Sequence, residues 1–240
     1  MKATEMVQAT TNRHDFGSGS ELAEALAETV AGTLAAAIAA RGAATLAVSG
    51  GNTPKAFFDA LSRHALDWSK VTVTLVDERM VPPAHERSNH RLASLFLLQN
   101  KAAEAHFVPL YRPGDDAAVV AKSAAEAIDE LALPFDVVVL GMGTDGHTAS
   151  FFPDGTTLDA VTDPACGQSV MSIEAPGAGE PRLTLTLPRI VEAGLIVLHI
   201  EGAEKQAVLS KALEAGAEAE LPVRAVLRHA ATPVEIYWAP

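Results

Sequence analysis

Three short apolar runs that each end in a glycine-rich turn limit most strongly how this chain can fold. They span residues 44–48, 136–140 and 195–200. Apolar runs of this length, rich in β-branched residues, are typical of strands buried on both faces of a parallel sheet. The turns are typical of strand-to-helix connections. The sequence therefore predicts an α/β fold: a doubly wound, Rossmann-like, mostly parallel sheet with helices on both faces.

A strictly alternating run at residues 182–187 predicts a strand of a different kind. Such alternation is typical of a half-buried strand, and we expect it to be antiparallel, so that the sheet has some antiparallel edge strands. Residues 154–181, which are rich in Pro and Gly, predict a long irregular excursion over the sheet edge that includes one candidate strand at 169–173. Other patterns predict strands at 71–76, 106–110 and 234–238, and helices at 22–38, 88–98, 115–131 and 222–227.

Two predicted helices carry specific expectations. In the helix that follows the first glycine turn, Thr53 is expected as the N-cap and Pro54 as the first helical residue. In the helix at 88–98, the apolar spacing predicts that Leu95 faces the core.

Composition and charge exclude several classes of protein. With 240 residues, 48% apolar and 5% aromatic, the chain suits one α/β domain spanning 1–240. The single cysteine, Cys166, excludes an internal disulfide and fits a reducing compartment. A net charge of −12 argues against nucleic acid or an anionic membrane as a partner. No stretch is expected to reach membrane-spanning length, and residues 1–20 are polar, so we expect a cytoplasmic monomer or small homo-oligomer.

The turn after the first run is a candidate phosphate site. Gly50 and Gly51 allow backbone amides to point at an anion, and Ser49 and Thr53 add hydroxyl groups. The alternative is a close strand-to-helix turn that needs glycine for steric reasons alone. Lys205, early in a later helix, is placed where a cation could complete the site, although a lone lysine there is more often solvated.

Charged residues also follow two other strands. Asp77 and Arg79 come directly after the run at 71–76, where a polar ligand could bind or where the charges could simply pair with one another. Asp145 and His147 follow the run at 136–140. Histidine as a residue type titrates near neutrality, and an aspartate two residues earlier can orient it, so this pair carries the first functional hypothesis.

Five motifs together resemble those of the 6-phosphogluconolactonases of the pentose phosphate pathway. They are SGGNTP, VDERMVP, SNHRL, GMGTDGHTASFFP and RLTLTLP, in family order over most of the chain. The wider family includes glucosamine-6-phosphate deaminases, in which the segment after the histidine resembles an asparagine-glutamate arrangement. Residues 149–153 read ASFFP instead. This departure favours the lactonase.

The resemblance implies hydrolysis of 6-phospho-D-glucono-1,5-lactone to 6-phospho-D-gluconate, without metal or cofactor. His147 would be the base that activates water, with Asp145 beside it. Arg79 and Asp77 would lie near the sugar. The phosphate would be surrounded by Ser49, Gly50, Gly51 and Thr53, with Arg182 and Lys205 as cations. Arg79 and the amides of residues 141–143 are the candidates for stabilising the oxyanion.

Two other readings of the same residues remain open. The first is aldose-ketose isomerisation with deamination of an amino sugar phosphate, in which Asp77 would move a proton at C2. The second is a sugar-phosphate sensor without activity. A sensor would be expected to carry a DNA-binding segment, and residues 1–20 are short and not basic.

Overall fold

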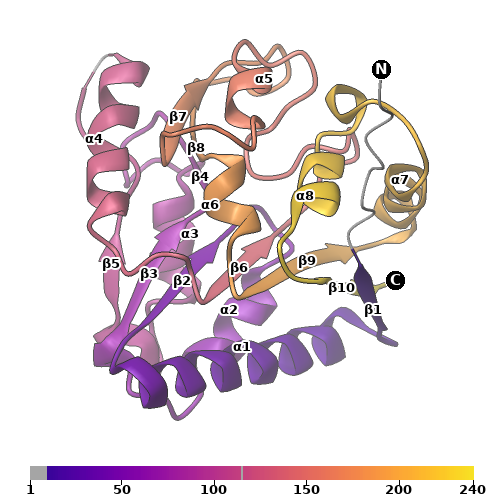
Figure 1. Cartoon of the computed structure of the whole chain (residues 1–240). Coiled ribbons are helices and arrows are strands. Elements are labelled where there is room, and N and C mark those ends of the chain that lie inside the picture. Colours follow the sequence, from indigo (N-terminus) through magenta and orange to yellow (C-terminus); the bar gives the residue numbers. More distant parts are fainter. Residues whose placement is uncertain (1–9, 115) are drawn as a thin grey trace.

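A seven-stranded parallel sheet forms the centre of the molecule (Figure 1). The computed structural model describes residues 10–114 and 116–240. The strand order is β1 (Thr11–Asp15), β10 (Val234–Ala239), β9 (Leu195–Glu201), β6 (Val137–Leu140), β2 (Ala44–Val48), β3 (Val71–Leu75) and β5 (His106–Val108). Every neighbouring pair in it is parallel, which confirms the predicted fold class. All residues of β2 and β6 are buried, as their apolar runs predicted.

The antiparallel strands form a small second sheet rather than extending the first. Its order is β4 (Asp77–Arg79), β8 (Arg182–Leu185) and β7 (Val170–Ile173). The expectation that the run at 182–187 is half-buried was wrong, because all four residues of β8 are buried. The amide of Leu185 in β8 donates to the carbonyl of Val76 at 2.8 Å. Because Val76 directly follows β3, this hydrogen bond connects the small sheet to the end of a strand of the central sheet.

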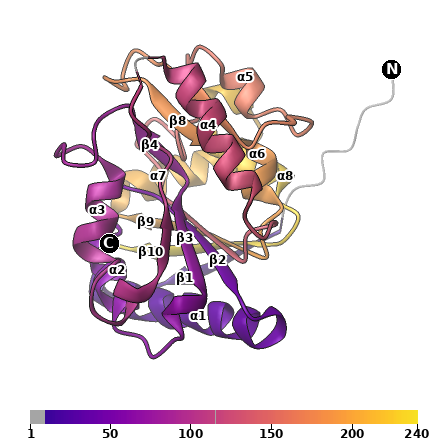
Figure 2. The same ribbon diagram turned by 90° about the vertical axis from the view of Figure 1, so that its left-hand side faces the viewer.

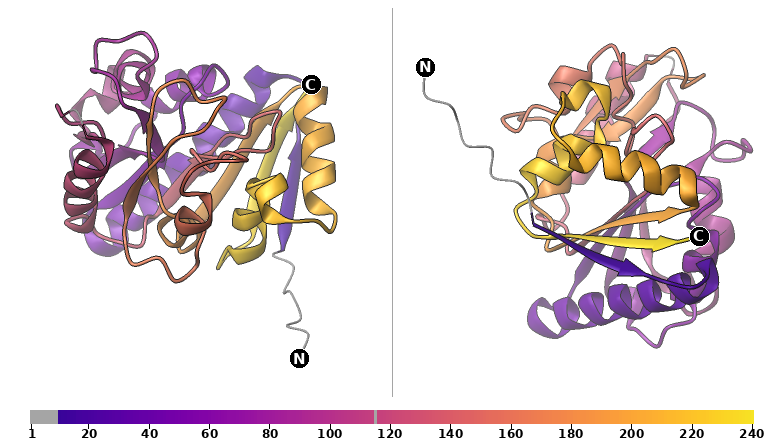
Figure 3. Two further views of the ribbon diagram at one scale, coloured as in Figure 1. Left: turned by 90° about the horizontal axis from the view of Figure 1, so that it is seen from above. Right: turned by 90° about the vertical axis from the view of Figure 1, so that its right-hand side faces the viewer.

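Helices cover both faces of the central sheet (Figures 1 and 2). The α-helices are α1 (Gly19–Arg41), α2 (Lys55–Ser62), α3 (Asn89–Phe96), α4 (Ala117–Asp129), α5 (Leu158–Val161), α6 (Leu187–Val191), α7 (Ala203–Leu213) and α8 (Val223–His229). α1 and α2 lie on one face, and α6, α7 and α8 lie on the other (Figure 3). α4 packs against β7 of the small sheet. α5 and β7 both fall within 154–181, so the candidate strand there is confirmed and the segment is less irregular than expected.

Helix α1 is long and apolar enough to span a membrane by length and composition, so the expectation that no stretch reaches that length was wrong. The structure gives this helix a different role. Leu22, Leu26, Val30 and Leu34 are fully buried, and α1 packs against α2, β2 and β10. Ser18 caps its first turn, and Gly42 ends it with a φ of 80°. Its apolar face is therefore part of the core.

Two local expectations were wrong. Helix α2 begins at Lys55 with Pro54 in the cap position, and Thr53 makes no capping hydrogen bond. Leu95 is 54% exposed, because the buried side of α3 is formed by Asn89 and Ala93. The predicted start of the helix at 115–131 lies outside the described residues, and α4 begins at Ala117.

Candidate active site

A pocket of about 520 Å³ opens at the carboxyl ends of β2, β3, β6 and β9, where ligands bind in open α/β sheets. All ten site residues predicted from the sequence line it: Ser49, Gly50, Gly51, Thr53, Asp77, Arg79, Asp145, His147, Arg182 and Lys205. The structure thus brings together residues that are up to 156 positions apart, from Ser49 to Lys205. Side chains that the sequence reasoning did not single out also line the pocket, among them Asn89, Phe152 and His199.

The side chains of Asp145 and His147 form a hydrogen-bonded pair. Nδ1 of His147 lies 2.6 Å from Oδ1 of Asp145, and the His147 amide donates to the same oxygen at 3.1 Å. Burial opposes ionisation of Asp145, but the hydrogen bonds and charge of His147 outweigh it and hold the pKa of this carboxyl below its ordinary value. A Cβ on Gly143 would overlap the imidazole, so glycine is required there for the ring to lie where it does.

Phe152 contacts two polar side chains of the pocket. Its ring centroid is 4.5 Å from that of His147, and the Arg182 guanidinium lies over the same ring at 5.5 Å. The turn at residues 148–151, which directly precedes Phe152, is tight. Ala149 has a φ of 48°, which costs a non-glycine residue about 1–3 kcal/mol, and Phe151 donates to the Thr148 carbonyl at 2.9 Å. The surrounding structure therefore holds this segment in a strained form beside the imidazole.

Arg79 and Arg182 lie directly opposite one another in the antiparallel pair β4–β8. Arg182 is only 5% exposed, and burial lowers the pKa of its guanidinium, as does the charge of Arg79, against the opposing effect of Asp77. The Nε atoms of both arginines are buried without a hydrogen-bond partner. Two facing guanidinium groups with free donors favour an anion between them or beside them.

Asp77 is held in place by side chains from two other segments. Ser150 donates to its Oδ2 at 2.6 Å, and Asn89 donates to its Oδ1 at 3.2 Å. Its neighbour Glu78 points to the other side of β4, where it accepts from Ser88 and from three backbone amides. Burial raises the pKa of Glu78, against the effect of those hydrogen bonds. Glu78 thereby anchors the start of α3.

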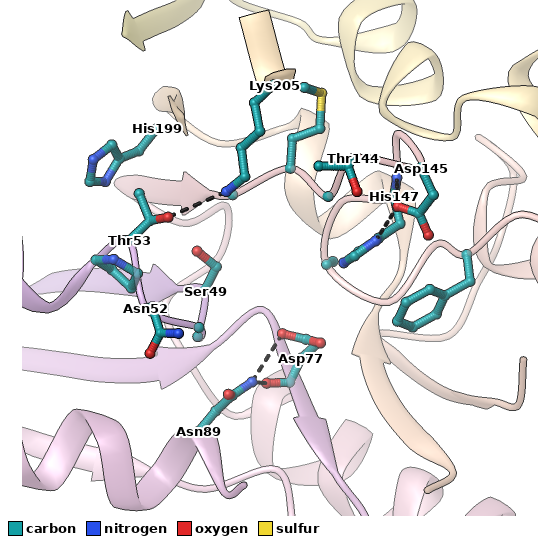
Figure 4. Close-up of a pocket in the computed structure, with 18 of the residues that line it drawn as sticks. Ser49, Asn52, Thr53, Asp77, Asn89, Thr144, Asp145, His147, His199 and Lys205 are labelled. Carbon is teal, nitrogen blue, oxygen red and sulfur yellow. Dashed lines mark hydrogen bonds and ion pairs between the residues drawn. The ribbon is translucent and has the colours of Figure 1, made fainter. Parts of the chain in front are cut away.

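The turn after β2 meets Lys205 at one side of the pocket. Nζ of Lys205 donates to Oγ1 of Thr53 at 3.3 Å, which is the contact that Thr53 makes in place of the predicted cap. Figure 4 shows Lys205 directed at Thr53, with Asp145 and His147 on the opposite side and Asp77 with Asn89 along a third. Burial lowers the pKa of the Lys205 ammonium, and the charge of Glu201 opposes this. A Cβ on Gly50 would overlap the Asn89 side chain.

One candidate for oxyanion stabilisation is already engaged. The amide of Gly143 donates to the His147 carbonyl at 2.9 Å, so it closes the turn and is not available to a ligand. That part of the expectation was wrong. Within residues 10–114 and 116–240, no group of three or more His, Cys, Asp or Glu side chains is arranged to hold a metal ion.

Comparison with known proteins shows a family match along most of the chain and several close relatives. The family described as "Glucosamine-6-phosphate isomerases/6-phosphogluconolactonase" matches residues 17–238. A 6-phosphogluconolactonase of Rhizobium meliloti (strain 1021) is 60% identical over 231 residues, which cover 96% of this chain and 100% of the relative. One of Mesorhizobium japonicum is 50% identical over 232 residues, covering 97% of each. The crystal structure of a 6-phosphogluconolactonase from Shewanella baltica OS155 has a TM-score of 0.94 at 39% identity, over 98% of this chain and 100% of that one.

Proposed function

Since this chain belongs to the glucosamine-6-phosphate isomerase/6-phosphogluconolactonase family, we propose that its pocket hydrolyses 6-phospho-D-glucono-1,5-lactone to 6-phospho-D-gluconate. The family resemblance indicated by the sequence motifs is confirmed, and the chain is an enzyme that hydrolyses lactones. In our proposal His147 activates the attacking water. The observation that carries the proposal is the Asp145–His147 pair in one pocket with the glycine turn at residues 49–53, the candidate phosphate site.

His147 acts first as a base. Because Nδ1 hydrogen bonds to the Asp145 carboxylate, the neutral ring carries its proton on that nitrogen and leaves Nε2 as the acceptor. Nε2 takes a proton from water as the water oxygen attacks C1 of the lactone. The Asp145 carboxylate stabilises the imidazolium that results.

The imidazolium then acts as an acid. When the tetrahedral intermediate collapses, the bond between C1 and the ring oxygen breaks, and the imidazolium returns its proton to that oxygen. The immediate products are the open-chain carboxylic acid and neutral His147, and the acid then loses a proton to solvent to give the carboxylate, so protons balance over the cycle. Arg79, with its buried and unpartnered Nε, is our candidate for stabilising the negative oxygen of the intermediate.

The phosphate group is bound, in our proposal, on the Lys205 side of the pocket. Lys205, the hydroxyls of Ser49 and Thr53 and the amides of Gly50 and Gly51 supply donors there. Arg182 adds a positive charge from β8. These groups make a local cationic site in a chain whose net charge is −12, so a dianionic substrate meets attraction at the pocket despite repulsion elsewhere.

Asp77 is the residue on which the isomerase-deaminase alternative rests. Both of its carboxylate oxygens accept hydrogen bonds from Ser150 and Asn89. A carboxylate engaged in this way suits a fixed binding role better than proton transfer at a sugar carbon. We therefore assign Asp77 to substrate binding.

The direct test supplies freshly generated 6-phosphoglucono-δ-lactone and follows its loss against the spontaneous rate. Glucosamine 6-phosphate and unphosphorylated gluconolactone are assayed alongside. Loss of the phosphorylated lactone well above background, with neither deamination nor equal activity on gluconolactone, is the expected result. Deamination would favour the alternative reaction, and binding of the lactone without hydrolysis would favour the sensor.

We further propose that residues 1–240 work as one domain, as a monomer or small homo-oligomer in the cytoplasm. A cluster of buried apolar side chains that includes residues of both sheets supports a single domain. The free thiol of Cys166 suits a reducing compartment. The negative net charge supports a small-molecule substrate rather than nucleic acid or membrane.

A further inference from the structure

A second histidine-carboxylate pair lies at the other end of the pocket and has no part in the mechanism above. His199 on β9 is 2% exposed and lines the pocket. Its Nε2 lies 3.1 Å from Oε1 of Glu201, and its ring meets that of Phe57 edge-on at 6.2 Å. In Figure 4 the imidazole lies on the Thr53 and Lys205 side, away from His147.

Glu201 is hydrogen bonded to His199 and lies beside the start of α1. His199 holds one carboxylate oxygen, and a side chain on Gly19, the first residue of α1, would meet the same carboxylate at 3.0 Å. A negative charge is stabilised at a helix N-terminus. The hydrogen bond from His199, more than the opposing effect of burial, lowers the pKa of Glu201, with smaller contributions from the charges of His199 and Lys205. Glu201 is thus a carboxylate held in its ionised form.

This carboxylate is close enough to Lys205 to interact with it electrostatically, yet the two do not pair. In the part of the chain that the structure describes, no ion pair joins them, and Lys205 donates to Thr53 instead. A carboxylate that paired with Lys205 would compete directly with a substrate phosphate for the ammonium group. In the structure, the group that Glu201 pairs with is His199.

We infer that His199 is a positioning residue for phosphate binding, which holds the Glu201 carboxylate against α1 and so keeps the Lys205 ammonium free for the substrate. The inference rests on the proposed function, because it gives Lys205 the phosphate as its ligand. His199 acts through Glu201, and its loss should weaken binding rather than the chemical step at His147. The two histidines then have separate tasks at the two ends of one pocket.

Four variants test this. His199→Leu removes the donor that holds Glu201, and His199→Gln keeps a donor at that position. The double variant His199→Leu with Glu201→Gln removes the competing charge as well. His14→Gln is the matched control, because His14 also pairs with a glutamate, Glu235, at 2.6 Å but does not line the pocket. For each variant, kcat and KM for the lactone are measured, together with calorimetric affinity for 6-phosphogluconate.

We expect His199→Leu to raise KM and weaken 6-phosphogluconate binding by about tenfold, as a nearby charge competing for the ammonium can do. The loss should fall mainly on KM and hardly on kcat. His199→Gln should lose much less, and the double variant should recover most of the affinity. A merely structural role for His199 would not be rescued by Glu201→Gln.

Unchanged affinity in His199→Leu, or no recovery in the double variant, would overturn the inference. If His199→Leu does not fold, the single variant Glu201→Gln decides: its KM should be no higher than that of the wild type, and a tenfold rise would overturn the inference. The proposed function fails separately. A wild-type protein that binds 6-phosphogluconate but hydrolyses no lactone would end the proposed reaction and leave the role of His199 testable by affinity alone.

Discussion

Nδ1 of His147 lies 2.6 Å from Oδ1 of Asp145, so one carboxylate oxygen fixes the orientation of the imidazole. The same oxygen also accepts the His147 amide, which ties the ring orientation to the backbone of the turn. Gly143 leaves the space in which the ring lies. The two-residue spacing of Asp145 and His147, the turn that holds them and the space left by Gly143 therefore together set the orientation of the His147 ring.

Asp145→Asn should reduce turnover by about 10²–10⁴-fold, because the neutral amide neither fixes the tautomer of His147 nor stabilises its imidazolium. The measurement is kcat on the phosphorylated lactone. Asp163→Asn is the matched control, since the Asp163 side chain accepts from the Ala165 amide in a loop and does not line the pocket. Equal turnover in the two variants would remove Asp145 from the reaction.

Lys205→Ala should act on binding. Loss of a charge-assisted contact to the phosphate costs about 1.5–3 kcal/mol, which corresponds to roughly 10- to 150-fold in KM. Lys211→Ala, on the same helix and exposed, should leave KM unchanged. Hydrolysis of unphosphorylated gluconolactone as efficient as that of the phosphorylated substrate would count against the whole phosphate site.

The affinity for 6-phosphogluconate should decline in alkaline solution at a pH below 10.5. Burial lowers the pKa of Lys205 from that ordinary value, and above its pKa the side chain is a neutral amine that attracts phosphate weakly. The sign is therefore a loss of affinity as pH rises. Calorimetry at rising pH measures it. Lys205→Arg keeps its charge throughout and should show no such decline; a parallel decline in both proteins would assign the titration to another group.

Arg79→Lys should lower kcat/KM by about tenfold or more, although the charge is kept. Arg79 faces Arg182 across β4 and β8 and has a buried, unpartnered Nε, so its planar fork of donors is what a lysine would lose. Steady-state kinetics separate positioning from charge stabilisation. Arg63→Lys, in an exposed pair with Asp59, serves as control. A variant with unchanged turnover and affinity would exclude Arg79 from the site.

The sequence was sufficient for the elements that carry local patterns. The strands β2, β6 and β9 are predominantly apolar runs, and the polar residues at and just beyond their ends had to meet at one edge once the sheet was parallel. This is why the predicted site residues that follow these strands line one pocket, whereas Asp77, Arg79 and Arg182 reach it from β4 and β8 of the small sheet. Their roles do not follow from that placement, and they stay predictions.

Elements whose structure depends on pairing with distant parts of the chain could not be predicted from local sequence patterns. Strand β4 consists of three charged residues, a pattern typical of the beginning of a loop. It forms a strand because Arg182 and its neighbours, about a hundred residues later in the chain, pair with it. Strand β1 is polar and was not predicted, since it is an edge strand whose pairing with β10 decides its structure. The apolar run at 195–200 predicted only that His199 lies inside a buried strand. The spacing of two between His199 and Glu201, which puts both side chains on one face, was the signal that could have identified it.

The most direct test of the account is the turnover of His147→Asn. Asparagine keeps some hydrogen-bonding ability but cannot accept the proton from water, so lactone hydrolysis should fall by about 10²–10⁴-fold. Thermal melting of the same purified variant should stay close to that of the wild type, and 6-phosphogluconate should still bind. A folded His147→Asn protein with near-native turnover would contradict the role of His147 as the base.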